Sequence, residues 1–398
     1  MDYKRSNTRI ALFGGGRWAR VLLSILLDNT KNSVLFTVHT KYFIKDMQNW
    51  INKLNLQNRV SVSTSKPNFQ DDYVGTIVAN AAKDHKKIAE LSLISKVPVF
   101  VEKPLTTSHQ DTLSLIDTAK KNDTLLFPSL VFLYASYIDN FINDLGDIKK
   151  IKEVRFNWMD ESAEYRYGEI KSFDPATPVF TDVLPHILSI LSKIFNSNDF
   201  EYNDCKVDRG GAFLNITIHV SNVKCILTLE RNSARRKREI FIKSDKDFAL
   251  DFSVEPGSIS INKKRSCGDL NWNLIESPLT KMINAFLSHM TTKKAHQSFN
   301  NELSISISNI IKKIEPEYKT SLQEWLISHL NQNEIVKNDI NYFLQEFLLR
   351  FTESSYEKTK AVKSQYLKAI CSKDFINKIN FNARSDDVFE YISSLDIS

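Results

Sequence analysis

Residues 9–19 read RIALFGGGRWA, and this stretch decides the fold. An apolar run ends at three glycines and is followed by apolar residues at helical spacing, which indicates a strand, a tight turn and a helix. Gly14, Gly16 and Ala19 fit the dinucleotide pattern G-x-G-x-x-G/A. In that pattern they would permit the turn, the approach of a pyrophosphate and close packing of helix on strand. The position after a first strand favours a cofactor site over a purely structural glycine turn, and Arg17 and Trp18 are predicted to face the cofactor.

Strand-like and helical segments alternate up to about residue 128. Buried strands are predicted at 34–38, 60–63, 76–79, 97–101 and 125–127. Helices are predicted at 17–28, 84–95 and 108–121. Ser108 and Asp111 form a capping signal at the start of the last helix. This alternation implies a parallel sheet covered on both faces, so we predict an α/β class with a doubly wound Rossmann domain over residues 1–128.

Longer strands follow this first domain. They are predicted at 151–158, 213–220, 224–230 and 240–243, and a helix at 180–195 interrupts them. We therefore predict an α+β substrate and oligomerisation domain over residues 129–333, with a large and mostly antiparallel sheet. Residues 334–398 carry apolar side chains at helical spacing among many lysines, which predicts a C-terminal helical extension.

Composition limits the function classes. The 398 residues are 42% hydrophobic and 25% charged with a net charge of +6, which is ordinary for a globular protein and too small for a nucleic-acid binder. The four cysteines are scattered without C-x-x-C spacing, so we predict no metal site and no disulfide framework. The longest apolar stretch, 125–138, is too short to span a bilayer, and the N-terminus lacks a signal-peptide core. We expect a cytoplasmic protein without a membrane partner.

The end of the second predicted strand bears on cofactor choice. NAD-binding domains usually place an acidic residue there, on the ribose 2′-hydroxyl. This chain has His39, Thr40 and Lys41, with no acid until Asp46. A hydroxyl and a cation suit a 2′-phosphate, so we predict NADP, with NAD as the alternative. A simple solvated turn is about as common an explanation of Thr40 and Lys41.

The segment from Asn80 to His85 and the run VEKPL at 101–105 resemble the Gfo/Idh/MocA oxidoreductase family, over about residues 8–330. The resemblance implies that Lys103 lies beside the nicotinamide and the substrate, that the Lys103–Pro104 bond is often cis, and that the cofactor site includes Asn80, His85 and Glu102. Physical reasoning agrees, because ligands of doubly wound sheets bind at the carboxyl ends of the strands. The alternative for Lys103 is a plain surface lysine.

The chain also resembles this family in an aspartate and a histidine four residues apart, here Asp182 and His186. That spacing places both side chains on one helical face. The resemblance implies that His186 exchanges a proton with a substrate oxygen and that Asp182 orients the substrate or the imidazole. The chain departs from the family pattern D-x-G-x-H-x-x-D, since Leu184 replaces the glycine, Pro185 follows it and Ser189 replaces the last acid. A histidine satisfied within the core is the alternative.

Two further segments are rich in charge. Residues 164–171 are dense in aromatic and charged groups. Four of them would suit contact with an anionic small-molecule substrate: Tyr165, Arg166, Tyr167 and Lys171. An ordinary polar loop is an equally common explanation. The run Arg235–Arg238 falls between two predicted strands and is expected to be a solvated hairpin turn rather than a nucleic-acid patch.

These observations predict an NADP-dependent reductase that interconverts a secondary alcohol and a ketone on a sugar or sugar-like molecule. Lys103 and His186 would polarise the substrate and transfer the proton. One alternative is reduction of a C=N bond on the same fold, and another is a catalytically silent cofactor-binding sensor or scaffold. The resemblance also implies a homo-oligomer.

Overall fold

The structure is a computed structural model, and it describes residues 8–65, 67–69, 73–161, 164–166, 168–170, 177–292 and 299–331. These residues form two compact units. One unit consists of the chain up to Asp139 together with Leu188–Lys193 and Leu270–Ser308. The other contains Asn140–Ile187, Ile194–Asp269 and the described residues after Ser308. The predicted extension at 334–398 lies outside the described residues, and the predicted domain boundaries stay a prediction.

The first unit contains the predicted parallel sheet. Its six strands lie in the order β3-β2-β1-β4-β5-β6. Their bounds are β1 Thr8–Phe13, β2 Val34–His39, β3 Val60–Ser63, β4 Tyr73–Val78, β5 Val99–Val101 and β6 Leu126–Pro128. Every neighbouring pair is parallel. The strand order reverses between β1 and β4, and ligands of such sheets bind outside the carboxyl ends at this position. The Rossmann prediction is therefore confirmed.

Helices connect these strands, as the alternating sequence pattern predicts. They are α1 Arg17–Asp28, α2 Ile44–Lys53, α3 His85–Ile94 and α4 His109–Lys121, with a short 3-10 turn at Ala82–Asp84. Ser108 caps α4, because its hydroxyl accepts a hydrogen bond from the Asp111 backbone N–H at 3.1 Å. The capping prediction is thus confirmed.

A helix from much later in the chain completes the core of this unit. Helix α7, Pro278–Thr292, contributes Met282, Ile283 and Phe286 to the same apolar cluster as α1 and β1. Phe286 packs edge-on against Phe100 and Phe127, with ring centroids 5.8 and 5.7 Å apart. The core of the cofactor domain is therefore closed by residues that follow the second sheet in the sequence.

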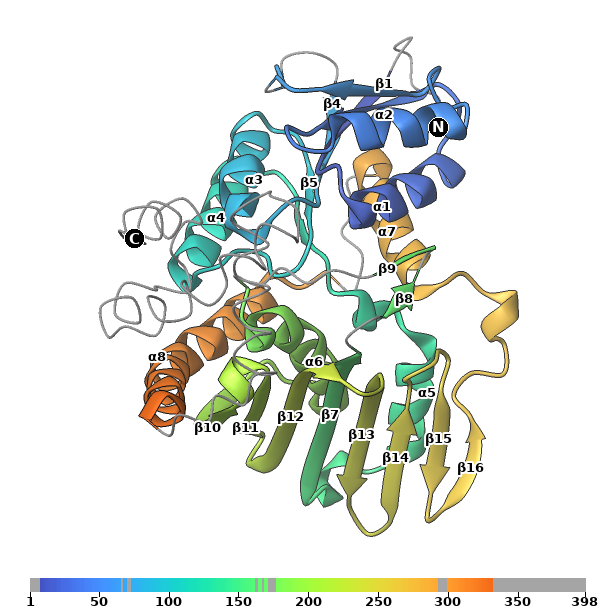
Figure 1. The fold of residues 1–398 in the computed structure, drawn as a ribbon. Coiled ribbons are helices and arrows are strands. Elements are labelled where there is room, and N and C mark those ends of the chain that lie inside the picture. Colours follow the sequence, from blue (N-terminus) through green and yellow to red (C-terminus); the bar gives the residue numbers. More distant parts are fainter. Residues whose placement is uncertain are drawn as a thin grey trace. The chain divides into compact units, whose positions relative to one another are not determined.

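The second unit contains an eight-stranded sheet in the order β10-β11-β12-β7-β13-β14-β15-β16, drawn as a row of neighbouring arrows in Figure 1. Its strands are β7 Glu153–Glu161, β10 Phe200–Asp208, β11 Phe213–Val220, β12 Val223–Ser233, β13 Lys237–Lys243, β14 Asp247–Asp251, β15 Ser258–Ile261 and β16 Lys264–Cys267. All pairs are antiparallel except β7 with β12. The prediction of a large, mostly antiparallel sheet is confirmed.

Alternation along these strands separates a buried face from an accessible one. In β11, Leu214, Ile216, Ile218 and Val220 are buried, and the residues between them are partly exposed. The remaining α-helices among the residues that the structure describes are α5 Ser136–Leu145, α6 Val179–Phe195 and α8 Asn301–Asn331. Tyr318 of α8 packs against Phe180 of α6, with ring centroids 5.0 Å apart. Both helices therefore contribute to the core of the second unit.

The predicted hairpin around the arginine run is wrong. Strands β12 and β13 are consecutive in sequence, but β7 lies between them in the sheet and pairs with both. Lys237 and Arg238 are already part of β13, and Arg238 pairs in register with Trp158 of β7. The run Arg235–Arg238 therefore leads into a central strand, which is why part of it is buried rather than solvated.

Candidate active site

The glycine turn after β1 has the conformation that a dinucleotide site requires. Gly14 has φ +128°, and a Cβ there would lie 2.6 Å from the Ala79 carbonyl oxygen, so only glycine fits without strain. Gly16 is the N-cap of α1, makes no side-chain capping bond and has open space where a Cβ would project. Ala19 is fully buried. The first backbone N–H groups of α1 are therefore placed as in a pyrophosphate site, and these residues fit a dinucleotide.

The end of β2 lies against this turn. A Cβ on Gly15 would be 2.7 Å from Thr40 Oγ1, which shows how closely Thr40 approaches the glycines. Lys41 is exposed. His39 is buried, stacks on Phe13 at 4.9 Å and bonds through Nδ1 to the Ser65 carbonyl oxygen at 2.8 Å. Because a carbonyl only accepts, His39 Nδ1 is the donor, and burial lowers the pKa of this imidazole.

Lys103 stands out in the segment that follows β5. From Val99 to Thr106 it is the one residue whose side chain is partly exposed. The Lys103–Pro104 peptide bond is cis, as the family resemblance implies. A partly exposed lysine thus lies at the carboxyl end of a parallel strand, where ligands of these sheets bind.

Buried polar residues hold the backbone on either side of Lys103. The Glu102 carboxylate accepts hydrogen bonds from Ser129 Oγ at 3.0 Å, from the Lys103 N–H at 3.2 Å and from the side chain of Trp18. Burial raises the pKa of Glu102. His85 is buried and contacts two backbone carbonyl oxygens, those of Pro104 at 2.8 Å and of Asn80 at 3.1 Å. Glu102 and His85 therefore brace the loop, and a direct contact of either with the cofactor stays a prediction.

Asn80 follows β4 beside the glycine turn. Its side-chain oxygen Oδ1 is buried and makes no hydrogen bond to any residue that the structure describes. A buried polar atom without a partner is costly, and a hydrogen bond from a bound ligand would remove that cost. This observation agrees with the predicted place of Asn80 in the cofactor site.

Helix α6 carries the second group of candidate residues. From Val179 to Leu191 every residue is buried except Asp182 and His186, which are both partly exposed. Their i, i+4 spacing puts them on one face of the helix. The His186 ring stacks on Trp158 of β7, with centroids 5.2 Å apart and planes inclined by 14°. The predicted acid–base pair is therefore the accessible part of an otherwise buried helix.

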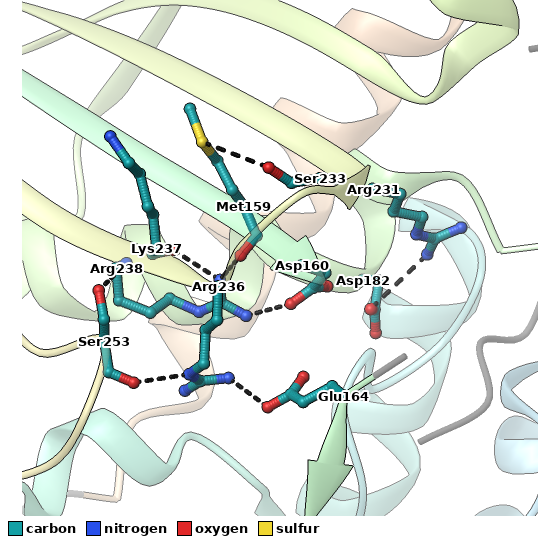
Figure 2. Close-up of polar contacts among 10 residues, drawn as sticks. All are labelled: Met159, Asp160, Glu164, Asp182, Arg231, Ser233, Arg236, Lys237, Arg238 and Ser253. Atoms are coloured by element: carbon teal, nitrogen blue, oxygen red, sulfur yellow. Dashed lines mark hydrogen bonds and ion pairs between the residues drawn. The ribbon is translucent and has the colours of Figure 1, made fainter. Parts of the chain in front are cut away.

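Asp182 has a cationic partner that the sequence analysis missed. Arg231 of β12 is buried, donates to the Thr177 carbonyl oxygen at 2.9 Å and lies 3.6 Å from Asp182 Oδ2 (Figure 2). A signal was present, because Arg231 continues the alternation of Cys225, Leu227 and Leu229, which are the buried positions of the strand. A charged residue in phase with such positions indicates a buried ion pair.

The arginine run forms two more ion pairs in the same part of the second unit. Arg238 pairs with Asp160, and both are almost fully buried, at 2% and 1% exposure. Arg236 donates to Glu164 Oε1 at 2.7 Å and to the Ser253 carbonyl oxygen at 2.8 Å (Figure 2). These arginines therefore neutralise internal carboxylates, which corrects the expectation of a solvated turn.

The predicted substrate segment is described only in part. Tyr165 is 71% exposed, and its hydroxyl donates to the Gly168 carbonyl oxygen at 2.7 Å. Arg166 lies 3.9 Å from Glu255 Oε2. Tyr167 and Lys171 lie outside the described residues. A substrate contact by any of the four stays a prediction.

Metal-binding clusters and membrane-spanning helices are both absent from the part of the chain that the structure describes. Those residues contain no group of three or more histidine, cysteine, aspartate or glutamate side chains that could hold a metal ion. None of the helices described is both long enough and apolar enough to cross a membrane.

Comparisons with known proteins agree with this geometry. Residues 8–129 match the family Gfo/Idh/MocA, described as an oxidoreductase family with an NAD-binding Rossmann fold. No curated protein sequence matches the chain. Among solved structures, UDP-N-acetylglucosamine 3-dehydrogenase GnnA from Acidithiobacillus ferrooxidans is 14% identical with a TM-score of 0.64, over 79% of this chain and 99% of that one. KijD10, a 3-ketoreductase from Actinomadura kijaniata solved with NADP and TDP-benzene, is 14% identical with a TM-score of 0.64, over 78% and 98%.

A third structure, GenD2 from gentamicin A biosynthesis in complex with NAD, is 12% identical with a TM-score of 0.63, over 80% of this chain and 95% of that one. At these identities the structures support the fold alone. The glycine turn and the parallel sheet define the class of nicotinamide dinucleotide-binding oxidoreductases. Within that class, residues 8–129 of this chain match the Gfo/Idh/MocA family, which confirms the resemblance over the cofactor domain.

Proposed function

We propose that the protein is an NADP-dependent reductase that interconverts a secondary alcohol and a ketone on a sugar or sugar-like molecule. The observation that carries this proposal is the acid–base pair on α6, since Asp182 and His186 are accessible where every neighbour on the helix is buried. Lys103 shows the same isolation in its own buried segment. Ionisable groups kept accessible within buried stretches suit contact with a ligand better than packing.

The roles of the residues follow from their chemistry. The nicotinamide, when bound, supplies or accepts the hydride. The Lys103 ammonium would donate a hydrogen bond to the substrate oxygen and stabilise negative charge on it. His186 would give that oxygen a proton during reduction, or take it during oxidation. Arg231 lies 3.6 Å from the carboxylate of Asp182, and this carboxylate would act as an acceptor for a substrate hydroxyl.

Nucleotide-linked hexoses are the substrate class we propose to test first. Two of the similar structures are a 3-dehydrogenase of a UDP-linked amino sugar and a 3-ketoreductase solved with a TDP compound. Such substrates are anionic, which would suit the arginine and the lysine among residues 164–171. Reduction of a C=N bond stays the alternative within the enzyme class.

The first experiment measures cofactor choice. We expect NADPH to bind more tightly than NADH in a fluorescence titration, because Lys41 would pair with the 2′-phosphate. Lys41→Ala should weaken NADPH binding about tenfold, a loss of about 1.4 kcal/mol in binding free energy, and should leave the affinity for NADH unchanged. Lys53→Ala, at the other end of the adjoining helix α2, is the matched control. Tighter NADH binding would overturn the NADP proposal, and binding of neither cofactor would overturn the proposed function.

The second experiment measures turnover. NADPH oxidation is followed with UDP- and TDP-linked 3-keto-hexoses, and His186→Asn and Lys103→Met are each expected to lower kcat by about 10²- to 10⁴-fold. The partly exposed His219 and the exposed Lys120 provide matched control variants, His219→Asn and Lys120→Met, whose kcat should not change. Tight NADPH binding without turnover of any ketone or imine would favour the silent cofactor-binding alternative.

A further inference from the structure

The His186 imidazole lies on a platform that the proton-transfer role does not by itself explain. Trp158, almost fully buried in β7, stacks with the imidazole at a centroid distance of 5.2 Å and an interplanar angle of 14°. Phe252 packs edge-on against the same indole at 6.3 Å. The histidine ring is therefore parallel to a large aromatic surface that is itself fixed in the core.

The indole is in turn held from the neighbouring strand. Arg238 of β13 is the register partner of Trp158, and its guanidinium carbon lies 3.9 Å from the centre of the indole ring. That distance is a close cation–π contact, and burial makes such contacts stronger.

The guanidinium has little freedom to move. Its Nη1 donates to the carbonyl oxygens of Met159 at 2.6 Å and of Lys237 at 2.7 Å, and its Nη2 pairs with Asp160 (Figure 2). Planar guanidinium groups bound at several atoms keep one orientation. Asp160, Arg238, Trp158 and His186 thus form a continuous series of contacts from the sheet to the accessible face of α6.

The backbone beneath His186 lacks one usual support. Pro185 lies inside α6 and has no N–H, so the helix loses the hydrogen bond that this residue would donate to the carbonyl of Thr181. A side chain on such a turn needs other contacts to keep a single orientation. The stacked indole is one such contact.

Burial of an arginine–aspartate pair costs free energy, because both charged groups lose their contact with water. Apolar residues of similar volume often give equal or greater stability, so the pair adds little to folding by itself. Burial lowers the pKa of Arg238 to about 10, well above neutral pH, so the guanidinium stays charged and the cation–π contact persists.

From these contacts we propose that Trp158 and Arg238 are positioning residues for His186, which hold the imidazole in the one orientation needed to exchange a proton with the substrate. This inference rests on the proposed function, but the orientation itself can be measured without substrate. Neither residue would touch the substrate oxygen. Their effect would be on kcat rather than on KM.

The test uses three variants of the full chain. Trp158→Phe keeps an aromatic platform, Trp158→Leu removes it, and Arg238→Met combined with Asp160→Asn removes the cation without leaving a lone buried charge. Phe156→Leu is the matched control, because Phe156 is another buried aromatic residue of β7, two positions before Trp158.

Histidine labelled at Cε1 gives the first readout, by NMR, with the His186 signal identified by its loss in His186→Gln. We expect the indole to shift this signal upfield in the wild type. Trp158→Leu should abolish the shift and the double variant should reduce it, while Phe156→Leu keeps it. An unchanged His186 signal in Trp158→Leu would overturn the proposal.

Kinetics give the second readout. Misplacement of a catalytic group by about 1 Å can lower the rate on the order of a hundredfold, so Trp158→Leu and the double variant should lower kcat by about ten- to a hundredfold with KM nearly unchanged. Trp158→Phe should retain most of kcat. Equal losses in Trp158→Leu and Phe156→Leu would mean a merely structural role and overturn the proposal. If the wild type reduces no ketone, the proposed function fails, and the His186 signal of the double variant, which keeps the indole, still decides whether Arg238 and Trp158 orient His186.

Discussion

At the scale of single residues, Glu102 shows how a buried carboxylate organises the loop of Lys103. Donors from Trp18, Ser129 and the Lys103 backbone converge on its two oxygens. Glu102→Gln keeps the shape but replaces one acceptor oxygen by a donor group. We expect this variant to lower the free energy of unfolding at low pH by about 1–3 kcal/mol, because at least one buried donor loses its acceptor.

The pH dependence of that loss has a definite sign. Burial raises the pKa of Glu102 above its ordinary value of 4.5, so the folded protein holds this proton more tightly than the unfolded chain. The resulting stabilisation is complete below the unfolded pKa and is lost as pH rises through the folded pKa. Glutamine cannot titrate. In urea unfolding, the free energy of unfolding of the wild type should therefore exceed that of Glu102→Gln by the most at about pH 4 and by less at about pH 8. An advantage that grows with pH would contradict this account.

The cysteines give a second prediction at this scale. Burial raises the pKa of both Cys205 and Cys225 to about 12, so their thiols stay protonated and unreactive at neutral pH. Cys267 is exposed. Brief iodoacetamide treatment of the native protein, followed by peptide mapping, should modify Cys267 and spare Cys205 and Cys225 until urea unfolds the chain. Rapid labelling of either buried thiol in the native state would show that the sheet opens locally.

At the scale of elements, the packing of α7 on the first sheet depends on a glycine. A Cβ on Gly75 of β4 would clash with Met290 Sδ, far inside van der Waals contact. Gly75→Val should therefore destabilise the protein by about 1 kcal/mol, at the low end of the usual overpacking cost of about 1–3 kcal/mol, because Met290 is flexible and partly exposed. Met290→Ala should recover part of the loss when the two changes are combined, because it removes the clashing atom. Urea unfolding of the single and double variants measures this coupling, and purely additive losses would show that α7 does not pack there.

The positions of the strands also explain why part of the arginine run is buried. Arg236 precedes β13 and Arg238 lies at its start, and that strand is next to β7 at the centre of the sheet. Asp160 at the end of β7 is in phase with the buried residues Val154, Phe156 and Trp158. An acid and an arginine that both occupy inward positions of neighbouring strands meet as a buried pair. This pairing depends on strand order, which local sequence does not contain.

At the scale of the whole molecule, the chain leaves its first unit after Asp139 and returns to it over Leu188–Lys193 and again over Leu270–Ser308. A fragment that ends at Asp139 lacks α7, so Met282, Ile283 and Phe286 no longer cover the apolar cluster they share with α1 and β1. We expect this fragment to bind the dye ANS and to unfold without a cooperative transition. Cooperative unfolding together with NADPH binding by the fragment would show that the sheet needs no such cover.

Local sequence determined a large part of this protein. The glycine turn, the alternation of strands and helices, the Ser108 cap and the i, i+4 pair of Asp182 and His186 all depend on neighbours within a few residues. These features follow from backbone conformation and periodicity, so the order of the residues is enough to predict them. Tertiary structure alone decided that β7 separates β12 from β13, that α7 closes the first core, and that Arg231 and Trp158 hold the α6 pair. Each of these joins segments far apart in the chain, and a contact between distant segments is fixed by the packing of the whole unit rather than by the local pattern of either one.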